Sequence, residues 1–343
     1  MLKMKYTTLG STGMEVSRLC LGCMSFSING KTKIHDWVLD EKESREIIER
    51  AIELGINFFD TANAYSNGES EKVLGKVLND YNRDEYVVST KGYFPTNLFS
   101  DEKETHPNSS GLSRKAIEQE LQNSLDRLGM DTIDLYYIHR WDYDTPIEET
   151  LKTLDDAVRR NQVRYIGASS MWTHQFAKAI YRSDHLGLER FISMQNHYNL
   201  VYREEEREMI PFCKEEKIAV IPWSPLAQGY LTRPHEKMTS TKRGEELTGF
   251  HQEYRQGGGP TINERVEEIA RQKGVKMAQI ALAWLLHKDT VDAPIIGTTS
   301  VKHLEEAVEA LEINLSDSEI EYLEEPYEPL LISGDKVPGS QVN

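Results

Sequence analysis

The 343-residue sequence is poor in cysteine, in long apolar stretches and in positive charge. Three cysteines are too few for a secreted disulfide scaffold and suit a reducing compartment. No apolar run approaches the roughly 20 residues that span a bilayer, and no apolar signal-peptide core follows the first methionine. The formal net charge of −16 argues against nucleic acid, because phosphate neutralisation dominates that binding. We therefore expect a cytoplasmic protein without a membrane or nucleic-acid partner.

Several motifs of common nucleotide, metal and hydrolase sites are also missing. No G-x-G-x-x-G follows an apolar strand, and no Walker, H-E-x-x-H or G-x-S-x-G motif occurs. Cys20 and Cys23 have no second CxxC pair, so we interpret them as packing residues and expect no metal site. The glycines at 257–259 lie in a long loop with no strand before them, which favours a flexible hinge over a phosphate cradle.

Short apolar segments alternate with longer amphipathic segments along the sequence. Eight segments are typical of buried parallel strands, at residues 19–21, 56–59, 86–89, 135–138, 165–168, 191–194, 219–223 and 293–296. Helical patterns cover residues 41–54, 69–78, 113–128, 146–160, 172–183, 204–216, 261–273, 278–287 and 301–311. Eight such units predict an α/β fold, and they favour a closed (β/α)8 barrel over an open doubly wound sheet.

A barrel of this kind needs about 250 residues, so the remaining residues must form additions to it. We expect an N-terminal β-hairpin at residues 6–17, and long loops at residues 25–40, 93–111 and 232–260 on the C-terminal face. We predict one barrel domain over residues 1–325 and an irregular, proline-containing C-terminal tail over residues 326–343.

Three of the predicted strands end in an ionisable residue. The strand at 56–59 runs into Asp60, the strand at 86–90 into Lys91, and the strand at 135–138 into His139. Tyr65 follows Asp60 in a polar loop. A buried carboxylate loses hydration, so Asp60 needs a cation or donors nearby. Because the carboxyl ends of barrel strands meet at one face, we expect these side chains to converge.

Together these four groups fit the reduction of a carbonyl group. A phenol is a weak acid near pH 7, and an ammonium beside it stabilises the phenolate. The carboxylate would keep the lysine charged, while the imidazole donates a hydrogen bond to the carbonyl oxygen. The tyrosine can then protonate that oxygen as negative charge develops on it. The hydride must come from a cofactor, because no side chain supplies one.

Each of the four residues, taken singly, also fits an ordinary role as a cap, turn, solvated or core residue. Their position on three consecutive strand ends favours a shared site.

A candidate anion site follows the last predicted strand. Gly297, Thr298, Thr299 and Ser300 directly precede a helix, whose N-terminus offers backbone donors to a phosphate. Lys302 and His303 can add positive charge there. The alternative is ordinary helix capping by Ser300. We favour phosphate binding, because it also provides a place for the missing cofactor.

Eight segments match a known family: TTLGSTGMEVSRLCLGCM, FFDTANAYSNGESEKVLG, STKGY, SLDRLGMDTIDLYYIHRWD, VRYIGASSMW, QNHYNL, IPWSPLAQGYL and PIIGTTSVKHLEEAVEA. Through them the sequence resembles the aldo-keto reductases along nearly its whole length. It looks closer to the long-loop branch, which contains aryl-alcohol dehydrogenase-like, versiconal hemiacetal acetate reductase-like and potassium-channel β-subunit-like members. The resemblance implies a (β/α)8 barrel that reduces aldehydes and ketones with NAD(P)H.

The resemblance also implies roles for particular residues. The family's catalytic tetrad maps onto Asp60, Tyr65, Lys91 and His139. The implied cofactor-binding residues are Gly22, Cys23, Met24, Ser169, Ser170, Gln195, Trp223, Ser224, Leu226, Gln228, Gly229, Gly297, Thr299, His303 and Glu306. Trp223 would stack on the nicotinamide ring.

The sequence departs from the family at His303, where relatives often carry Arg or Gln, and at Ala307, where they often carry Asn. Both positions belong to the part of the cofactor site that binds the adenosine and its phosphate. Either Lys302, or Lys242 together with Arg243, can replace the contacts that these two differences remove. We expect NADPH as the preferred cofactor, with NADH still open.

A small aldehyde or ketone is the expected substrate. Loop aromatics predicted to line its pocket are Trp37, Tyr93, Phe94, Trp141 and Trp172, although core packing is an equal alternative for each. A different function is also open, that of a nicotinamide-binding regulatory subunit with little turnover. Neither the substrate nor the oligomeric state follows from the sequence.

Overall fold

The central feature of the fold is a closed parallel barrel of eight strands. The computed structural model describes residues 4–30, 37–98, 100, 106–240 and 252–330. Its strands are β3 (Cys20–Gly22), β4 (Phe58–Asp60), β5 (Val87–Gly92), β6 (Ile133–Ile138), β7 (Val163–Ser169), β8 (Phe191–Gln195), β9 (Ala219–Val220) and β10 (Ile295–Gly297). They pair in parallel in the order β10-β3-β4-β5-β6-β7-β8-β9.

The barrel closes between β9 and β10. Val220 pairs in parallel with Val291, and the amide of Ile295 donates to the carbonyl of Pro222 at 2.8 Å. The prediction of a (β/α)8 barrel is therefore confirmed.

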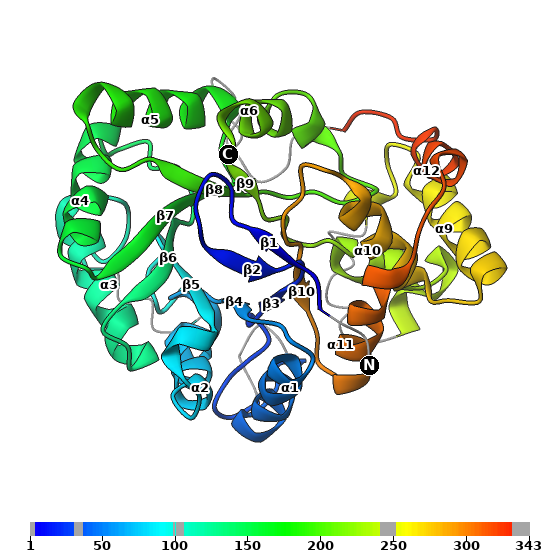
Figure 1. Ribbon diagram of the computed structural model, residues 1–343, viewed down its shortest axis with the longest axis horizontal. Coiled ribbons are helices and arrows are strands. Elements are labelled where there is room, and N and C mark those ends of the chain that lie inside the picture. Colours follow the sequence, from blue (N-terminus) through cyan, green and yellow to red (C-terminus); the bar gives the residue numbers. More distant parts are fainter. Residues whose placement is uncertain (1–3, 31–36, 99, 101–105, 241–251, 331–343) are drawn as a thin grey trace.

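Helices surround the strands as an outer ring (Figure 1). They are α1 (Glu41–Glu53), α2 (Glu69–Leu78), α3 (Arg114–Leu128), α4 (Ile147–Arg159), α5 (Thr173–Leu186), α6 (Met209–Glu216), α10 (Met277–His287) and α11 (Val301–Glu309), with α9 (Gly259–Lys273) and α12 (Asp317–Glu324) packed together further out. The sequence sets their ends locally. Asp40 and Glu43 form a reciprocal capping box at the start of α1, and Gly129 ends α3 in the left-handed conformation.

The structure differs from the predicted helices in two places. The segment predicted as one helix over residues 204–216 begins with a separate 3-10 turn, Glu204–Glu206, and α6 starts only at Met209. Pro211 lies in the first turn of α6, where its missing N–H costs no helical hydrogen bond. The short helix α12 was not anticipated, although Ser316 and Glu319 form a capping box at its start.

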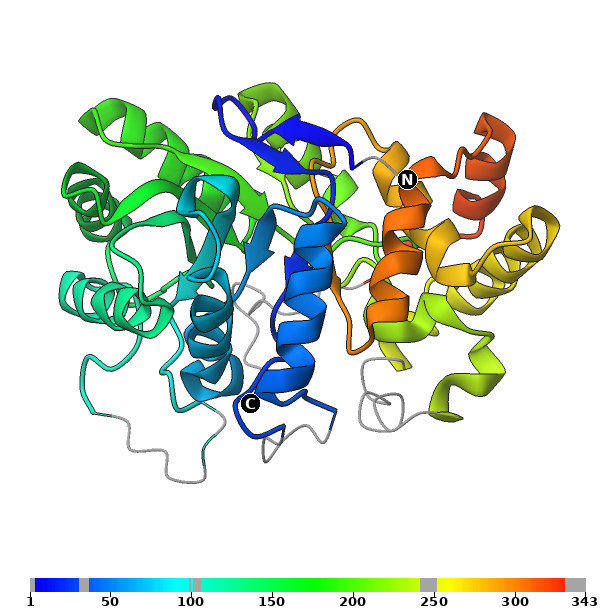
Figure 2. The ribbon, with the colours of Figure 1, turned by 60° about the horizontal axis from the view of Figure 1, so that its bottom comes forward.

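The N-terminal hairpin, predicted for residues 6–17, consists of β1 (Tyr6–Thr8) and β2 (Glu15–Ser17) paired antiparallel. It lies across one end of the barrel (Figures 1 and 2). Leu9 and Val16 belong to a fully buried apolar cluster with Phe58, Leu135 and Tyr137 from the barrel strands. The hairpin therefore closes this end of the barrel, which we call its base. Solvent reaches the barrel interior from the opposite end, where the strands terminate.

The glycine run at 257–259 is packed rather than open. Gly258 caps α9 in the left-handed conformation, and a Cβ on Gly259 would lie 1.6 Å from the carbonyl oxygen of Tyr254. Glu328 donates its amide to Gly257 O at 3.1 Å, which ties the C-terminal segment to this point. These contacts contradict the expected flexible hinge, because the glycines permit close backbone approach.

Within the described residues, no helix is both long enough and apolar enough to cross a bilayer.

Candidate active site

Strand alternation directs the key side chains into the barrel. Phe58, Val87 and Leu135 belong to the interior cluster at the base, and every second residue along a strand faces the same way. Asp60, Lys91 and His139 lie two or four residues further along these three strands. They therefore reach the upper, open end of the barrel interior, as the sequence predicts.

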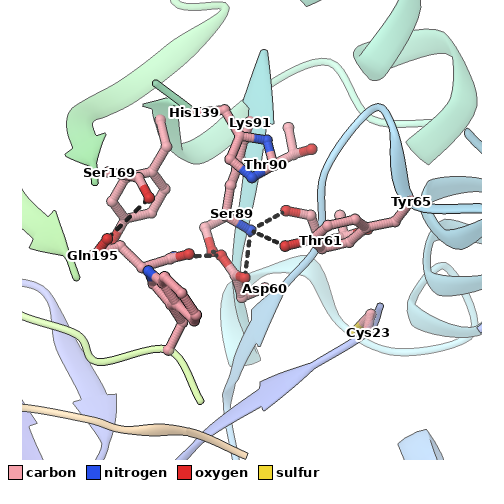
Figure 3. Close-up of polar contacts among 12 residues, drawn as sticks. Cys23, Asp60, Thr61, Tyr65, Ser89, Thr90, Lys91, His139, Ser169 and Gln195 are labelled. Atoms are coloured by element: carbon pink, nitrogen blue, oxygen red, sulfur yellow. Dashed lines mark hydrogen bonds and ion pairs between the residues drawn. The ribbon is translucent and has the colours of Figure 1, made fainter. Parts of the chain in front are cut away.

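Asp60 and Lys91 form a buried ion pair at this end (Figure 3). The Lys91 Nζ lies 2.6 Å from Asp60 Oδ2 and donates to the carbonyl oxygen of Thr61 at 2.8 Å. The other carboxylate oxygen of Asp60 accepts from Ser89 Oγ at 2.7 Å and from Gln195 Nε2 at 3.0 Å. The carboxylate thus has the donors that its burial requires.

Lys91 remains a cation at this buried position. Burial alone lowers the pKa of Lys91, but the Asp60 carboxylate and the Tyr65 hydroxyl outweigh it, and the net pKa is raised above its ordinary value. A charged ammonium is thereby fixed within the barrel mouth.

Tyr65 begins the 3-10 turn Tyr65–Gly68 that follows β4. Its hydroxyl accepts a hydrogen bond from Lys91 Nζ at 3.2 Å, and the same ammonium lies 4.8 Å from the centre of the ring. Hydrogen bonds connect Asp60 to Lys91 and Lys91 to Tyr65. The phenol therefore lies directly against the lysine that pairs with Asp60.

His139, directly after the end of β6, completes the group. Its ring meets that of Tyr65 edge-on, with centroids 6.0 Å apart. Burial, together with the positive charges of Lys91 and Arg140, lowers the pKa of His139 well below its ordinary value. The imidazole is therefore neutral near pH 7. Its Nδ1 has no hydrogen-bond partner among the described residues.

A cavity of about 1200 Å³, lined at its inner end by Asp60, Tyr65 and His139, extends toward α11. All the implied cofactor-binding residues line it except Cys23; they are Gly22, Met24, Ser169, Ser170, Gln195, Trp223, Ser224, Leu226, Gln228, Gly229, Gly297, Thr299, His303 and Glu306. The Cys23 side chain is fully buried, and its Sγ lies 3.6 Å from the carbonyl oxygen of Leu21, so it faces the protein interior.

Trp223 is held by neighbours that the sequence did not reveal. Its indole Nε1 donates to Ser170 Oγ at 3.0 Å. Its ring stacks on His197 at 4.2 Å, and His197 stacks in turn on Tyr202 at 4.1 Å. Burial, aided by the charge of Arg140, lowers the pKa of His197 to about 3, so this stack stays neutral at ordinary pH. No local sequence signal pointed to these ring contacts.

The N-terminus of α11 lies on the wall of the cavity. The Ser300 side chain makes no capping hydrogen bond with this helix, which removes the capping alternative. Lys302 and His303 line the cavity here, and so does Lys276, a residue that sequence reasoning missed. Lys276 precedes α10 and is distant in sequence from α11, so only the fold brings it to this end. Lys242 and Arg243 lie outside the described residues.

The five aromatic side chains that were predicted to line the substrate pocket divide into two groups. Trp37, Phe94 and Trp172 line the cavity, and the ring of Phe94 meets His139 edge-on at 5.1 Å. Tyr93 and Trp141 do not line it and pack partly buried against the core. For these two the packing alternative describes the structure better.

Residues 18–328 match the Aldo/keto reductase family. An Alternaria alternata protein named as an aldo-keto reductase is 42% identical, over 96% of this chain and 93% of the relative. A putative aryl-alcohol dehydrogenase of Saccharomyces cerevisiae and the versiconal hemiacetal acetate reductase of Aspergillus parasiticus are each 40% identical, over 96% of this chain and 98% of either relative. The matched span, the barrel and the buried Asp–Lys–Tyr chain lead to one conclusion: the chain belongs to the aldo/keto reductase family.

Proposed function

We propose that the protein reduces aldehydes or ketones to alcohols with NADPH. The observation that carries this proposal is the contact chain in which Lys91 Nζ lies 2.6 Å from Asp60 Oδ2 and 3.2 Å from Tyr65 Oη, at the inner end of the large cavity. A cation fixed beside a phenol is the arrangement expected of a tyrosine that gives up a proton.

The lining of the cavity supports binding of an extended dinucleotide. Its walls offer an aromatic face at Trp223, polar groups at Ser170 and Gln195, and an uncapped helix N-terminus at α11. A reduced nicotinamide bound there would supply the hydride. Trp223 would hold the ring in place, and Ser170 and Gln195 would orient its amide.

Side chains of the protein would supply the proton and orient the carbonyl group. Tyr65 would donate its hydroxyl proton to the carbonyl oxygen as negative charge develops there. Lys91, kept charged by Asp60, would stabilise the phenolate that remains. Neutral His139 would donate a hydrogen bond to the same oxygen and orient the carbonyl between itself and Tyr65. The aromatic rings of Trp37, Phe94 and Trp172 would exclude water from the carbonyl group.

We propose NADPH rather than NADH because basic side chains line the far end of the cavity. Lys276, Lys302 and His303 all line that end, with Thr299 before the helix. Glu306 is the opposing charge and lies 4.0 Å from Lys302 Nζ, at the limit of an ion pair. A phosphate on the adenosine ribose would find more positive than negative charge there.

The test is the oxidation of NADPH and NADH by purified protein with a panel of aldehydes, including 4-nitrobenzaldehyde and methylglyoxal. We expect turnover with at least one aldehyde, and a higher kcat/KM for NADPH than for NADH. Tight NADPH binding without turnover of any aldehyde would overturn the enzyme proposal and favour a regulatory nicotinamide-binding protein. Equal or better use of NADH would overturn the phosphate assignment alone.

A further inference from the structure

The turn that carries Tyr65 has an unusual backbone. Ser66, Asn67 and Gly68 follow Tyr65 with φ values of 49°, 55° and 85°. Left-handed backbone is costly for residues with side chains, and it persists only where the surroundings enforce it. Something outside the turn must therefore hold it in place.

Arg127 from α3 packs directly against this turn. A Cβ on Gly68 would lie 2.9 Å from Arg127 Cδ and 3.1 Å from Thr96 Cγ2, so both side chains already touch the glycine. The turn can approach them only because residue 68 has no side chain. The stem of Arg127 thus supports the turn from the outer side of the barrel.

The guanidinium of Arg127 is fixed by Glu71, in the first turn of α2. Its Nε lies 2.6 Å from Glu71 Oε2, and the Glu71 side chain is fully buried. The other oxygen, Glu71 Oε1, accepts a hydrogen bond from Thr90 Oγ1 at 2.6 Å. Thr90 immediately precedes Lys91 on β5 and points outward where Lys91 points inward. Glu71 therefore connects the support of the tyrosine turn to the strand that carries the lysine.

Glu120 extends the cluster to the substrate side. Its Oε1 lies 2.5 Å from Arg127 Nη2, and both of its oxygens lie 3.2 Å from Thr96 Oγ1. Thr96 follows Phe94 by two residues in the same loop, and Phe94 contacts the ring of His139. The cluster thereby touches the segments that bear Tyr65 and Lys91, and also the loop whose Phe94 contacts His139.

We propose that Glu71, Arg127 and Glu120 form a positioning network that holds the Tyr65 turn at hydrogen-bonding distance from Lys91. This inference rests on the proposed reductase function, because its kinetic consequence is the geometry of proton donation. None of the three residues lines the cavity, so each acts through Tyr65, Lys91 or Phe94 rather than on substrate or cofactor.

The test compares wild type with Arg127→Met and Arg127→Lys. Arg127→Met keeps much of the stem and removes the charge, and we expect kcat to fall about 10- to 100-fold, as small misplacements of reacting groups do. The dissociation constant of NADPH should stay within about twofold, because the cofactor walls are untouched. Arg127→Lys restores one charge beside Glu71 and should recover part of the loss.

A second measurement is independent of turnover. Amide hydrogen exchange of the peptide that covers residues 64–68 should be at least about tenfold faster in Arg127→Met than in wild type. If no aldehyde is turned over by wild type, the reductase proposal fails, while the exchange result still decides whether the network holds the turn.

The matched control is Arg83→Met. Arg83 Nη2 pairs with buried Asp134 Oδ2 at 2.7 Å, near the start of β6 at the closed end of the barrel. This variant should lower the melting temperature without changing kcat or exchange in the 64–68 peptide. If Arg127→Met instead behaves like this control, it will lower only the melting temperature. An unchanged kcat, or unchanged hydrogen exchange in the 64–68 peptide, would refute the positioning role.

Discussion

At the scale of single residues, the site depends on one buried lysine with three hydrogen-bond partners. The Asp60 carboxylate compensates the burial of the ammonium, which also donates to the carbonyl oxygen of Thr61 and to Tyr65. Removing the hydroxyl of Tyr65 would leave the ion pair intact, because Asp60 and Thr61 still bind the ammonium. The proposed proton-donating role of Tyr65 can therefore be tested without disturbing its surroundings.

For Tyr65→Phe we expect kcat for aldehyde reduction to fall by about 10² to 10⁴, the contribution typical of a general acid. The dissociation constant of NADPH, measured by quenching of protein fluorescence, should stay within about twofold. Tyr143→Phe is the control, since Tyr143 is 51% exposed and does not line the cavity. Parallel loss of cofactor binding and turnover would show that Tyr65 serves the cofactor and not the proton.

At the scale of secondary-structure elements, α2 and α3 pack closely against each other. A Cβ on Gly75, in the middle of α2, would lie 2.1 Å from the carbonyl oxygen of Leu128 at the end of α3. The small residue lets the two helices approach, and their contact region also contains the Glu71–Arg127 pair. Packing and charge thus cooperate at one interface beneath the tyrosine turn.

Gly75→Ala should therefore destabilise the protein, although alanine is the better helix former. Overpacking costs about 1–3 kcal/mol, against a gain in helix propensity of about 1 kcal/mol. We expect a lower urea midpoint with an unchanged m-value. Gly13→Ala is the control, because a Cβ there meets nothing within 4 Å. A midpoint at or above wild type would show that the helices can separate without cost.

At the scale of the whole molecule, one carboxylate joins the base of the barrel to the hairpin. Asp292 Oδ2 accepts from the amide of Val220 at 2.8 Å, and the Gly10 amide and Arg18 also interact with it. Burial nevertheless outweighs these contacts and raises the pKa of Asp292 to about 6. The native state therefore keeps a proton on this group at pH values where the unfolded chain has lost it.

The direction of the Asp292 pKa shift determines how stability changes with pH. Because the folded pKa exceeds the unfolded value, the contribution of Asp292 to stability decreases as pH rises from about 4 to 6, and the cost persists above that window. Asp292→Asn keeps an acceptor for Val220 and removes the charge. We expect it to stabilise the protein by about 1–3 kcal/mol at pH 7.5 and by about half as much at pH 5, measured by urea unfolding.

The control for this prediction is Asp289→Asn, whose carboxylate pairs with Lys214 at the surface and is 76% exposed. This variant should bring no gain at either pH. If Asp292→Asn loses stability at pH 7.5, the carboxylate is a net stabiliser and the inferred cost of burial is wrong.

The amino-acid sequence alone is enough to predict the barrel and the convergence of Asp60, Lys91 and His139. Buried, continuously apolar strands that end in ionisable residues bring those residues together at one face of a parallel barrel, and the structure confirms that placement. The sequence also indicated the hairpin and most helix ends, because caps and turns act within a few residues of themselves.

The packing of the elements in three dimensions is needed to tell which side chains face the cavity and which support it from behind. Cys23, Tyr93 and Trp141 follow strand ends as their neighbours do, yet they turn away from the cavity. Lys276 and His197 line the cavity, whereas the Glu71–Arg127–Glu120 cluster supports the Tyr65 turn from α2 and α3. Local propensity carries no information about such contacts, because they depend on how close two helices pack and where a barrel closes.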